Sequence, residues 1–245
     1  MLKDLPDKVE KDMWLNFSPE EKQLYLANLA QVNEQLQQQL ELEKVDSILI
    51  LAMMTRLRQI CCEPRMLYEN YKGESTKFSM CLDLIETLKE NGKKVLLFSS
   101  FTSIFDDFIE EFDRQGIKYH MITGAVDKKK RKEEVDAFQN DDSNVFLISL
   151  KAGGTGLNLT KAQAVIHFDP WWNVSAQNQA TDRAYRIGQT KNVLVYQLLM
   201  KNTIEEKIYE MQKRKKEMSD LFVENSNGGI STLSKEELKD LFSMD

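Results

Sequence analysis

Short apolar runs alternate with amphipathic segments from residue 77 to residue 199. The apolar runs have the length and composition of buried β-strands, and they occur at residues 95–98, 119–122, 145–148, 164–168 and 193–199. Segments with helical spacing of apolar residues lie around them, at residues 77–90, 104–114, 128–139 and 176–185. This alternation predicts an α/β fold in which helices cover both faces of a parallel sheet. Ligands in such folds bind at the carboxyl ends of the strands, here beside residues 99–100 and 150–156.

The first seventy residues have a different, helical pattern. Ser18, Pro19 and Glu21 stand where an N-cap, a first helical residue and the partner of a capping box would stand. Apolar residues then recur at helical spacing, and residues 48–60 predict a second helix that Pro64 ends.

Two further helices are predicted after the sheet, at residues 203–223 and 234–242, with a flexible break between them. The chain is therefore expected to consist of three segments: a helical one at 1–70, an α/β one at 71–202 and a helical one at 203–245.

Composition excludes several classes of protein. The 245 residues are 42% hydrophobic and 29% charged, which is typical of a globular protein. No apolar run approaches the ~20 residues that a membrane-spanning helix needs, and the polar start lacks the features of a secretory signal. Three cysteines and two histidines, without a Cys-x-x-Cys pair, argue against a disulfide framework or a metal site and favour the cytoplasm.

The net charge of −6 argues, by itself, against nucleic acid as a partner, because phosphate contacts require Lys and Arg. Nine basic residues are nevertheless concentrated in two runs, Lys128 to Lys132 and Lys213 to Lys216. Each run is equally compatible with a solvated helix face, so composition leaves the partner open.

Gln179, Arg183 and Arg186 stand four and three positions apart in the string QATDRAYRIGQ, residues 179–189. On one helix this spacing places the three side chains on the same face. Two guanidinium groups on one face suit a phosphate chain, because each is permanently charged and can donate two parallel hydrogen bonds. The alternative is a surface helix whose arginines form ion pairs with neighbouring acids.

A glycine-rich string, SLKAGGTGLNL at residues 149–159, follows a predicted strand. Glycines at such a place let backbone amides approach a phosphate or a nucleic-acid backbone closely. The string is not a phosphate-binding loop of the Walker A type, because no Lys-Ser or Lys-Thr closes it.

Taken in chain order, these segments resemble the C-terminal helicase lobe of the SWI/SNF-type ATPases of superfamily 2. The resemblance runs through nearly the whole chain and includes the strings at residues 57–61, 96–102, 151–159, 169–173 and 179–189, and the pattern formed by Gly124, Arg131, Val135 and Phe138. It implies a RecA-like sheet with an N-terminal helical protrusion and a C-terminal helical brace. Ser100 and Val174 depart from the family, which often has Gln and usually Pro there.

For ATP, the resemblance implies roles at five positions. Arg183 and Arg186 would be the arginine fingers, and Gln179 would position them or contact the nucleotide. Gly154 and Gly156 would bind the nucleotide and connect its cleft with the DNA backbone.

For DNA, the resemblance implies five further positions. Ser99 and Ser100 would face the DNA groove, and Ser149 and Lys151 would lie beside the DNA backbone. Trp172 is either a core residue or a DNA-proximal one.

The resemblance also implies what the chain works with. No Walker A string and no Asp-Glu pair occur in it, and in this family both lie on an N-terminal lobe. The chain is therefore expected to be a fragment or a separately encoded half, inactive alone, that shares ATP and Mg²⁺ with that lobe. Its other partners would be double-stranded DNA and a DNA-bound protein as the target of remodelling, without a membrane.

The compact run from Gly156 to Gln189 resembles bacterial or archaeal members, which implies a cytoplasmic, nucleoid-associated protein. A stand-alone interaction module, with the helices of residues 18–64 as its docking surface, is the alternative.

Overall fold

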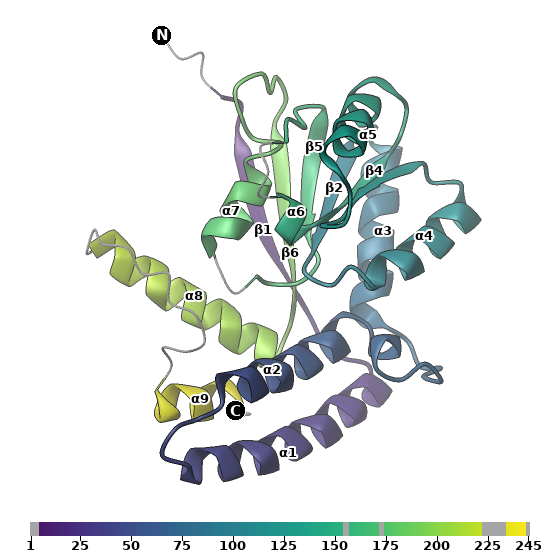
Figure 1. The fold of residues 1–245 in the computed structure, drawn as a ribbon. Coiled ribbons are helices and arrows are strands. Elements are labelled where there is room, and N and C mark those ends of the chain that lie inside the picture. Colours follow the sequence, from purple (N-terminus) through teal and green to yellow (C-terminus); the bar gives the residue numbers. More distant parts are fainter. Residues whose placement is uncertain (1–4, 154–156, 172–173, 222–233, 244–245) are drawn as a thin grey trace. The chain divides into compact units, whose positions relative to one another are not determined.

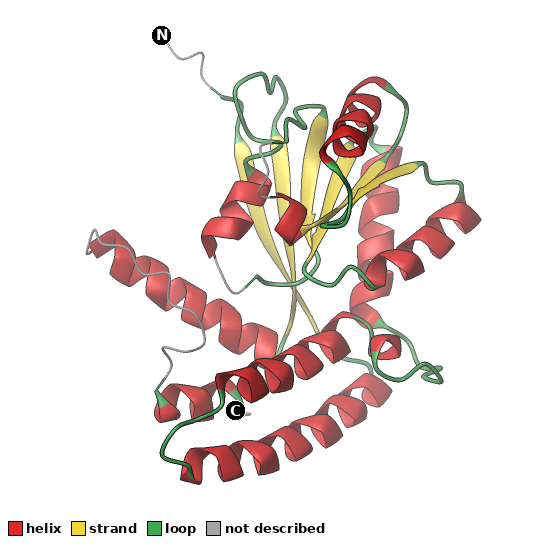
Figure 2. Ribbon diagram, viewed as in Figure 1, coloured by secondary structure: helices red, strands yellow, loops and turns green. Residues whose placement is uncertain are grey.

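A computed structural model describes residues 5–153, 157–171, 174–221 and 234–243. Within these residues six strands form one sheet, in the order β1-β6-β5-β2-β4-β3 (Figure 2). The strands are β1 (Lys8–Leu15), β2 (Lys94–Ser99), β3 (Tyr119–Ile122), β4 (Val145–Ser149), β5 (Ala162–His167) and β6 (Val193–Met200). Neighbouring strands from β6 to β3 pair in parallel, which confirms the predicted fold class. Each predicted strand agrees with an observed one to within two residues.

One face of the sheet is covered by α5 (Lys128–Asn140), α6 (Leu150–Gly153) and α7 (Val174–Thr181) (Figure 1). Phe138 of α5 and Ala180 of α7 belong to a buried cluster with Leu96 and Phe98 of β2. Leu96 and Phe98 are two positions apart, so both point to this face of the strand.

The opposite face is covered by α3 (Thr76–Glu90) and α4 (Ile104–Gln115). The Phe108 ring of α4 packs on Phe78 of α3 and on Phe168, with ring centroids 4.6 and 5.3 Å apart. Burial on both faces explains why β2 and β4 are uninterrupted apolar runs in the sequence.

β1 was not predicted, because its sequence KVEKDMWL has no apolar alternation. It lies at the edge of the sheet, where its first five residues are exposed. Charged side chains are common on edge strands, since they discourage pairing with another chain.

The chain forms two compact units: Met1–Trp14 with Phe78–Leu199, which contains most of the sheet, and Leu15–Lys77 with Met200–Asp245. The helices of the second unit are α1 (Pro19–Glu41), α2 (Ser47–Cys62), the 3₁₀ helix η1 (Pro64–Met66), α8 (Ile204–Leu221) and α9 (Lys235–Leu241). The segment boundaries expected at residues 70 and 202 stay predictions.

The capping box at the start of α1 is confirmed: the Ser18 hydroxyl accepts from the Glu21 N–H at 3.3 Å, and Glu21 accepts from the Ser18 N–H at 2.8 Å. The buried Glu21 carboxylate also accepts from the N–H and the hydroxyl of Thr76, at 2.9 and 2.5 Å. One carboxylate therefore stabilises the first turns of α1 and α3.

Helix α2 carries apolar residues on two faces. Ile50 and Met53 are buried, whereas Ile48 and Leu51 are 80% and 48% exposed.

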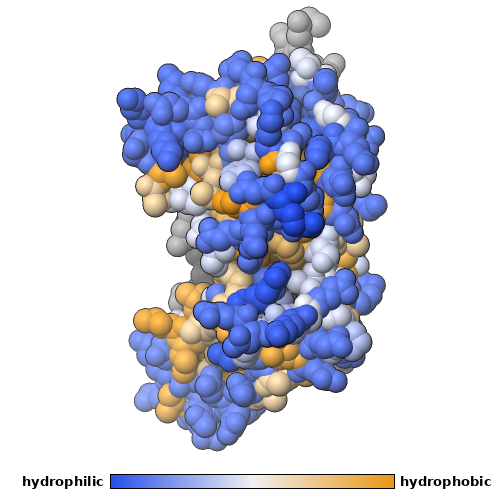
Figure 3. Space-filling view, turned by 90° about the vertical axis from the view of Figure 1, so that its right-hand side faces the viewer, coloured by the Kyte–Doolittle hydropathy of each residue, from blue (hydrophilic) through white to orange (hydrophobic). Residues whose placement is uncertain are grey.

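Figure 3 shows one side of the molecule, on which hydrophilic side chains predominate and apolar ones form separate patches.

A buried ion pair joins two distant parts of the second unit. Lys77 Nζ lies 2.5 Å from both carboxylate oxygens of Glu205, and both side chains are fully buried. Burial by itself would lower the pKa of Lys77, but the Glu205 carboxylate raises it above its ordinary value, so the ammonium group stays charged. Glu205 also accepts from the Met200 N–H at 3.0 Å.

We predict that Glu205→Ala lowers the free energy of unfolding by about 3–5 kcal/mol, because it leaves a buried ammonium group without its counter-ion. The double variant Lys77→Met with Glu205→Leu should lose less than the sum of the two single variants in urea denaturation. Asp142→Ala, which breaks the exposed Lys118–Asp142 pair, is the control and should change nothing measurable. Additive losses in the double variant would contradict this account.

Candidate functional site at the carboxyl ends of the strands

Three polar residues meet where β2 and β5 end. Asp169 is completely buried and accepts from the Ser99 hydroxyl at 2.8 Å, from the Ser100 N–H at 2.9 Å and from the Ser100 hydroxyl. A buried carboxylate is costly unless it is hydrogen-bonded in this way. The Ser99 hydroxyl also accepts from the Phe101 N–H at 3.1 Å, so the loop after β2 is fixed to the loop after β5.

Ser149, at the end of β4, is buried as well, and its hydroxyl accepts from the Ala152 N–H at 3.3 Å. It therefore caps the single turn of α6. The side chains of Ser99 and Ser149 do not face solvent in this structure, while Ser100 is partly exposed. Direct DNA contacts by these serines stay predictions.

The helix that carries the predicted arginines is shorter than expected. The sequence predicts a helix to residue 185 with Gln179, Arg183 and Arg186 on one face, but α7 ends at Thr181. The backbone hydrogen bonds change at this point. The Arg183 N–H donates to the Ala180 carbonyl, three residues back instead of four, at 3.1 Å, and the Arg183 carbonyl accepts from the Leu159 N–H at 3.0 Å, outside the helix.

The buried Gln189 side chain completes this arrangement. Its amide donates to the carbonyls of Ala162 and Ala184 at 2.9 and 3.0 Å, and its oxygen accepts from the backbone N–H groups of the two following residues. Gly188 has φ +105°, a conformation that side chains other than hydrogen rarely allow. Gln189, the last residue of the Ile-Gly-Gln string, thus connects this turn to Ala162 at the start of β5.

Gln179, Arg183 and Arg186 therefore do not lie on one helix: Gln179 is on α7, and the two arginines follow its end. Gln179 is exposed on α7, Arg183 is partly buried in the turn and Arg186 is exposed. Arg186 Nη1 donates to the Leu157 carbonyl at 3.3 Å, which fixes it to the glycine-rich string. Arg183 Nε is buried and finds no hydrogen-bond acceptor among the described residues.

Several predicted site residues cannot be placed. Gly154, Gly156 and Trp172 lie outside the described residues, as does the Lys151 side chain. Their predicted contacts with nucleotide and DNA stay predictions.

A second buried contact in this region has no counterpart in any sequence pattern. The imidazole of His167, at the end of β5, lies 2.9 Å from the Thr181 hydroxyl, and both side chains are buried. Burial lowers the pKa of His167 from 6.5 to about 4, although the carboxylates of Asp169 and Glu10 act in the opposite direction. The ring is therefore uncharged at neutral pH.

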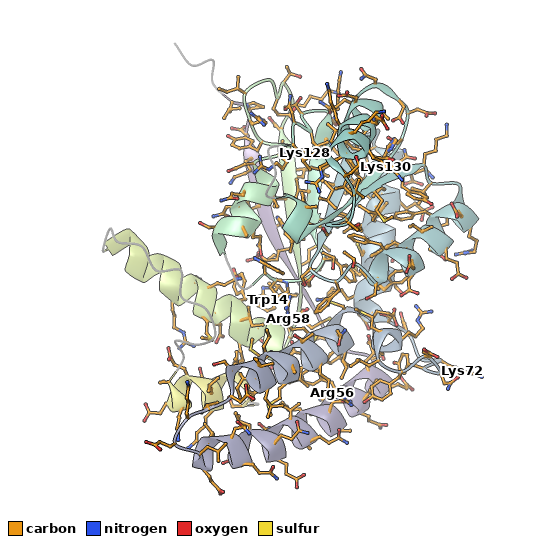
Figure 4. All side chains as sticks on the ribbon, viewed as in Figure 1. Trp14, Arg56, Arg58, Lys72, Lys128 and Lys130 are labelled. Atoms are coloured by element: carbon orange, nitrogen blue, oxygen red, sulfur yellow. The ribbon has the colours of Figure 1, made fainter. Side chains whose placement is uncertain are left out.

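A basic surface lies on α5. Lys128, Lys129 and Lys130 are exposed in its first turn, and Figure 4 labels two of them. Arg131 behaves differently: it is partly buried and donates to the Val126 carbonyl at 3.2 Å.

Comparisons with known proteins identify the kind of domain to which this site belongs. Residues 76–188 match the family of the helicase conserved C-terminal domain. An uncharacterized ATP-dependent helicase of Mycoplasma pneumoniae is 39% identical over 99% of this chain, and a RAD54-like DNA repair and recombination protein of Drosophila pseudoobscura is 31% identical over the whole of this chain. The chain spans only 23% and 35% of these two relatives.

Two solved structures of Sulfolobus solfataricus are also similar. The SWI2/SNF2 ATPase core in complex with double-stranded DNA has a TM-score of 0.80 at 30% identity, and the chain covers 52% of it. The C-terminal domain of that ATPase has a TM-score of 0.78 at 26% identity, and it is covered completely. The chain therefore carries a helicase C-terminal domain with the RecA-like fold. It belongs to the SWI2/SNF2 type, as its motifs predicted.

No helix among the described residues is both long and apolar enough to cross a membrane.

We predict a pH dependence of stability that comes from His167. The unfolded chain takes up a proton on this residue below pH 6.5, whereas the folded chain does so only near pH 4. The stabilising contribution is therefore complete above pH 6.5 and is lost as the pH falls towards 4. Between about pH 7 and about pH 5, urea denaturation should show a larger loss of stability for the natural chain than for His167→Gln, which does not titrate. Equal losses would show that burial does not perturb this histidine.

Proposed function

We propose that this chain is the second motor lobe of an ATP-dependent translocase on double-stranded DNA. In this proposal Arg183 and Arg186 act on ATP and Mg²⁺ in a cleft that an N-terminal helicase lobe completes. Each ATP cycle would close and open the cleft and move the enzyme along the DNA backbone. The similarity to the ATP-dependent helicases and to the DNA-bound ATPase core supports this function.

The observation that carries the proposal is the state of Arg183. Its Nε is buried and has no acceptor among the described residues, although its backbone is held from both sides of the turn. A buried guanidinium donor without a partner costs free energy. The Arg183 side chain is only partly buried, so an anionic ligand could approach its charged group and offset part of this cost. A triphosphate fits this requirement, since arginine binds phosphate oxygens with strong, charge-assisted hydrogen bonds. Arg186, exposed beside it, adds a second permanent charge.

The DNA contacts in this proposal come from backbone-directed groups. The exposed lysines in the first turn of α5 and the loops after β2 and β4 would face phosphates, which carry no sequence information. Binding should accordingly have little sequence preference and a strong dependence on salt. A DNA-bound protein as the target of the motor is part of the same proposal.

We predict that Arg186→Ala and Arg183→Ala each abolish DNA-stimulated ATP hydrolysis when the chain is combined with its N-terminal lobe. Loss of an arginine finger costs about 10³-fold or more in rate, because charge developing on the transferred phosphoryl group is no longer stabilised. The matched control is Arg114→Ala, which removes an exposed arginine of α4. Circular dichroism should show that all variants remain folded. Full activity of Arg186→Ala would refute its assignment as a finger.

We also predict that replacing Lys128, Lys129 and Lys130 with Gln weakens DNA binding of the isolated chain. The slope of the logarithm of affinity against the logarithm of salt concentration should become shallower by about 0.9 for each phosphate that a lysine no longer neutralises. Replacing three exposed lysines of the helical unit, Lys22, Lys44 and Lys72, makes the same charge change and is the control. If both triple variants lose affinity equally, net charge alone explains the binding.

A further inference from the structure

A buried contact between two side chains lies directly before the turn that carries Arg183. His167 is the last residue of β5, and Thr181 is the last residue of α7. The ring nitrogen Nε2 and the hydroxyl oxygen Oγ1 are 2.9 Å apart, and the two side chains are 1% and 5% exposed. Whichever tautomer is present, one of the two groups donates and the other accepts.

Thr181 also holds the turn that follows α7 through its backbone carbonyl. Its carbonyl accepts from the N–H groups of Ala184 and Tyr185, both at 3.1 Å. Arg183 lies between Thr181 and these two donors, so the direction of the Thr181 peptide group influences the direction in which the Arg183 side chain leaves the backbone. The hydroxyl of the same residue is fixed by His167.

The histidine, in turn, has little freedom to move. Its ring stacks on Phe98 of β2, with centroids 5.7 Å apart and an angle of 23° between the planes. β2 and β5 are parallel neighbours in the middle of the sheet, and Phe98 is paired with His167 in their register. The position of the imidazole is therefore fixed relative to strands β2 and β5.

We propose that His167 positions Arg183 by holding Thr181, so that the sheet, through one side-chain hydrogen bond, aligns the arginine with its phosphate ligand. This inference rests on the proposed function of Arg183. His167 and Thr181 act as positioning residues, because they act on the arginine through the backbone of the turn. A hydrogen bond in so buried a place is firm, since no water can replace it at low cost.

The chain provides two pairs of variants for a test. Thr181→Val has nearly the same shape without the hydroxyl, and Thr181→Ser keeps the hydroxyl. His167→Leu removes the ring nitrogens, and His167→Gln offers an amide at the place of Nε2. We expect Thr181→Val and His167→Leu to lower kcat for DNA-stimulated ATP hydrolysis about tenfold, with KM for ATP changed less than twofold, because misalignment weakens the transition state more than binding. The serine and glutamine variants should regain most of the rate.

A local measurement in the chain itself is independent of activity. Hydrogen exchange of the Ala184 and Tyr185 amides should become at least tenfold faster in Thr181→Val, because the turn is no longer held, and should stay near the natural rate in Thr181→Ser. Combining His167→Leu with Thr181→Val should add little to either single effect.

Thr203→Val is the matched control for a general loss of stability. Thr203 is also 5% exposed, and its hydroxyl donates to the Met200 carbonyl at 2.7 Å in the helical unit. We expect this variant to lose a similar part of its thermal stability as Thr181→Val while its kcat and the exchange of Ala184 stay unchanged.

Three outcomes would overturn the inference or the proposed function, and they can be told apart. If Arg183→Ala abolishes hydrolysis but Thr181→Val and His167→Leu leave kcat and amide exchange unchanged, His167 does not position the arginine. If Thr203→Val lowers kcat as much as Thr181→Val, the loss comes from stability and the inference also fails. If Arg183→Ala itself is fully active, the proposed function fails, whatever the exchange measurements show.

Discussion

The polar groups buried at the carboxyl ends of the parallel strands are the constraint on which the site depends. Parallel strands that are covered on both faces are apolar along their length, and polar residues appear where they end. Here these residues, among them Ser99, Ser149 and Asp169, stay buried, so each of them must find a hydrogen-bond partner within the protein. The partners are backbone groups or side chains of the next loop. Burial at this edge therefore fixes the loops that would meet a ligand.

The same requirement shapes the turn after α7. The helix ends earlier than its sequence predicts, and carbonyl groups of the turn accept from the Leu159 N–H and from the Gln189 side chain. The turn is held at several points, while the Arg183 Nε keeps no acceptor among the described residues. A rigid backbone with an unsatisfied cationic donor is the arrangement that pre-organised phosphate binding requires, since little is left to order when the ligand arrives.

The sheet was predictable because its strands are short, wholly apolar runs between turns, a pattern that depends only on local sequence. β1 was missed for the opposite reason, since an edge strand buries too little to show apolar alternation. The end of α7 was not predicted, because the turn that follows it bonds to other segments, for example to the Leu159 N–H, and helical spacing does not reveal such contacts. The contacts of His167 and Lys77 could not be predicted for the same reason. Their partners lie 14 and 128 positions away in the sequence, and no spacing rule connects residues so far apart. The motif strings located the site in the sequence. Only the structure shows that Ser99 and Ser149 are buried whereas Arg186 is exposed.

The first turn of α5 carries lysines, whose positive charge is unfavourable at the positive end of the helix dipole. Other helices of the chain, such as α1, α4 and α8, begin with acidic residues, which suit the positive end of the helix dipole. α5 instead has Lys128, Lys129 and Lys130 there, next to the Asp127 cap, which accepts from two backbone N–H groups at 2.8 and 2.9 Å. Lysines on a solvated helix face would be less costly in any later turn, so their position in the first turn favours an anionic ligand over that alternative. In the proposed DNA complex a phosphate at this turn would meet the lysines and the positive end of the dipole together, so that what is unfavourable in the free protein becomes complementary to the ligand.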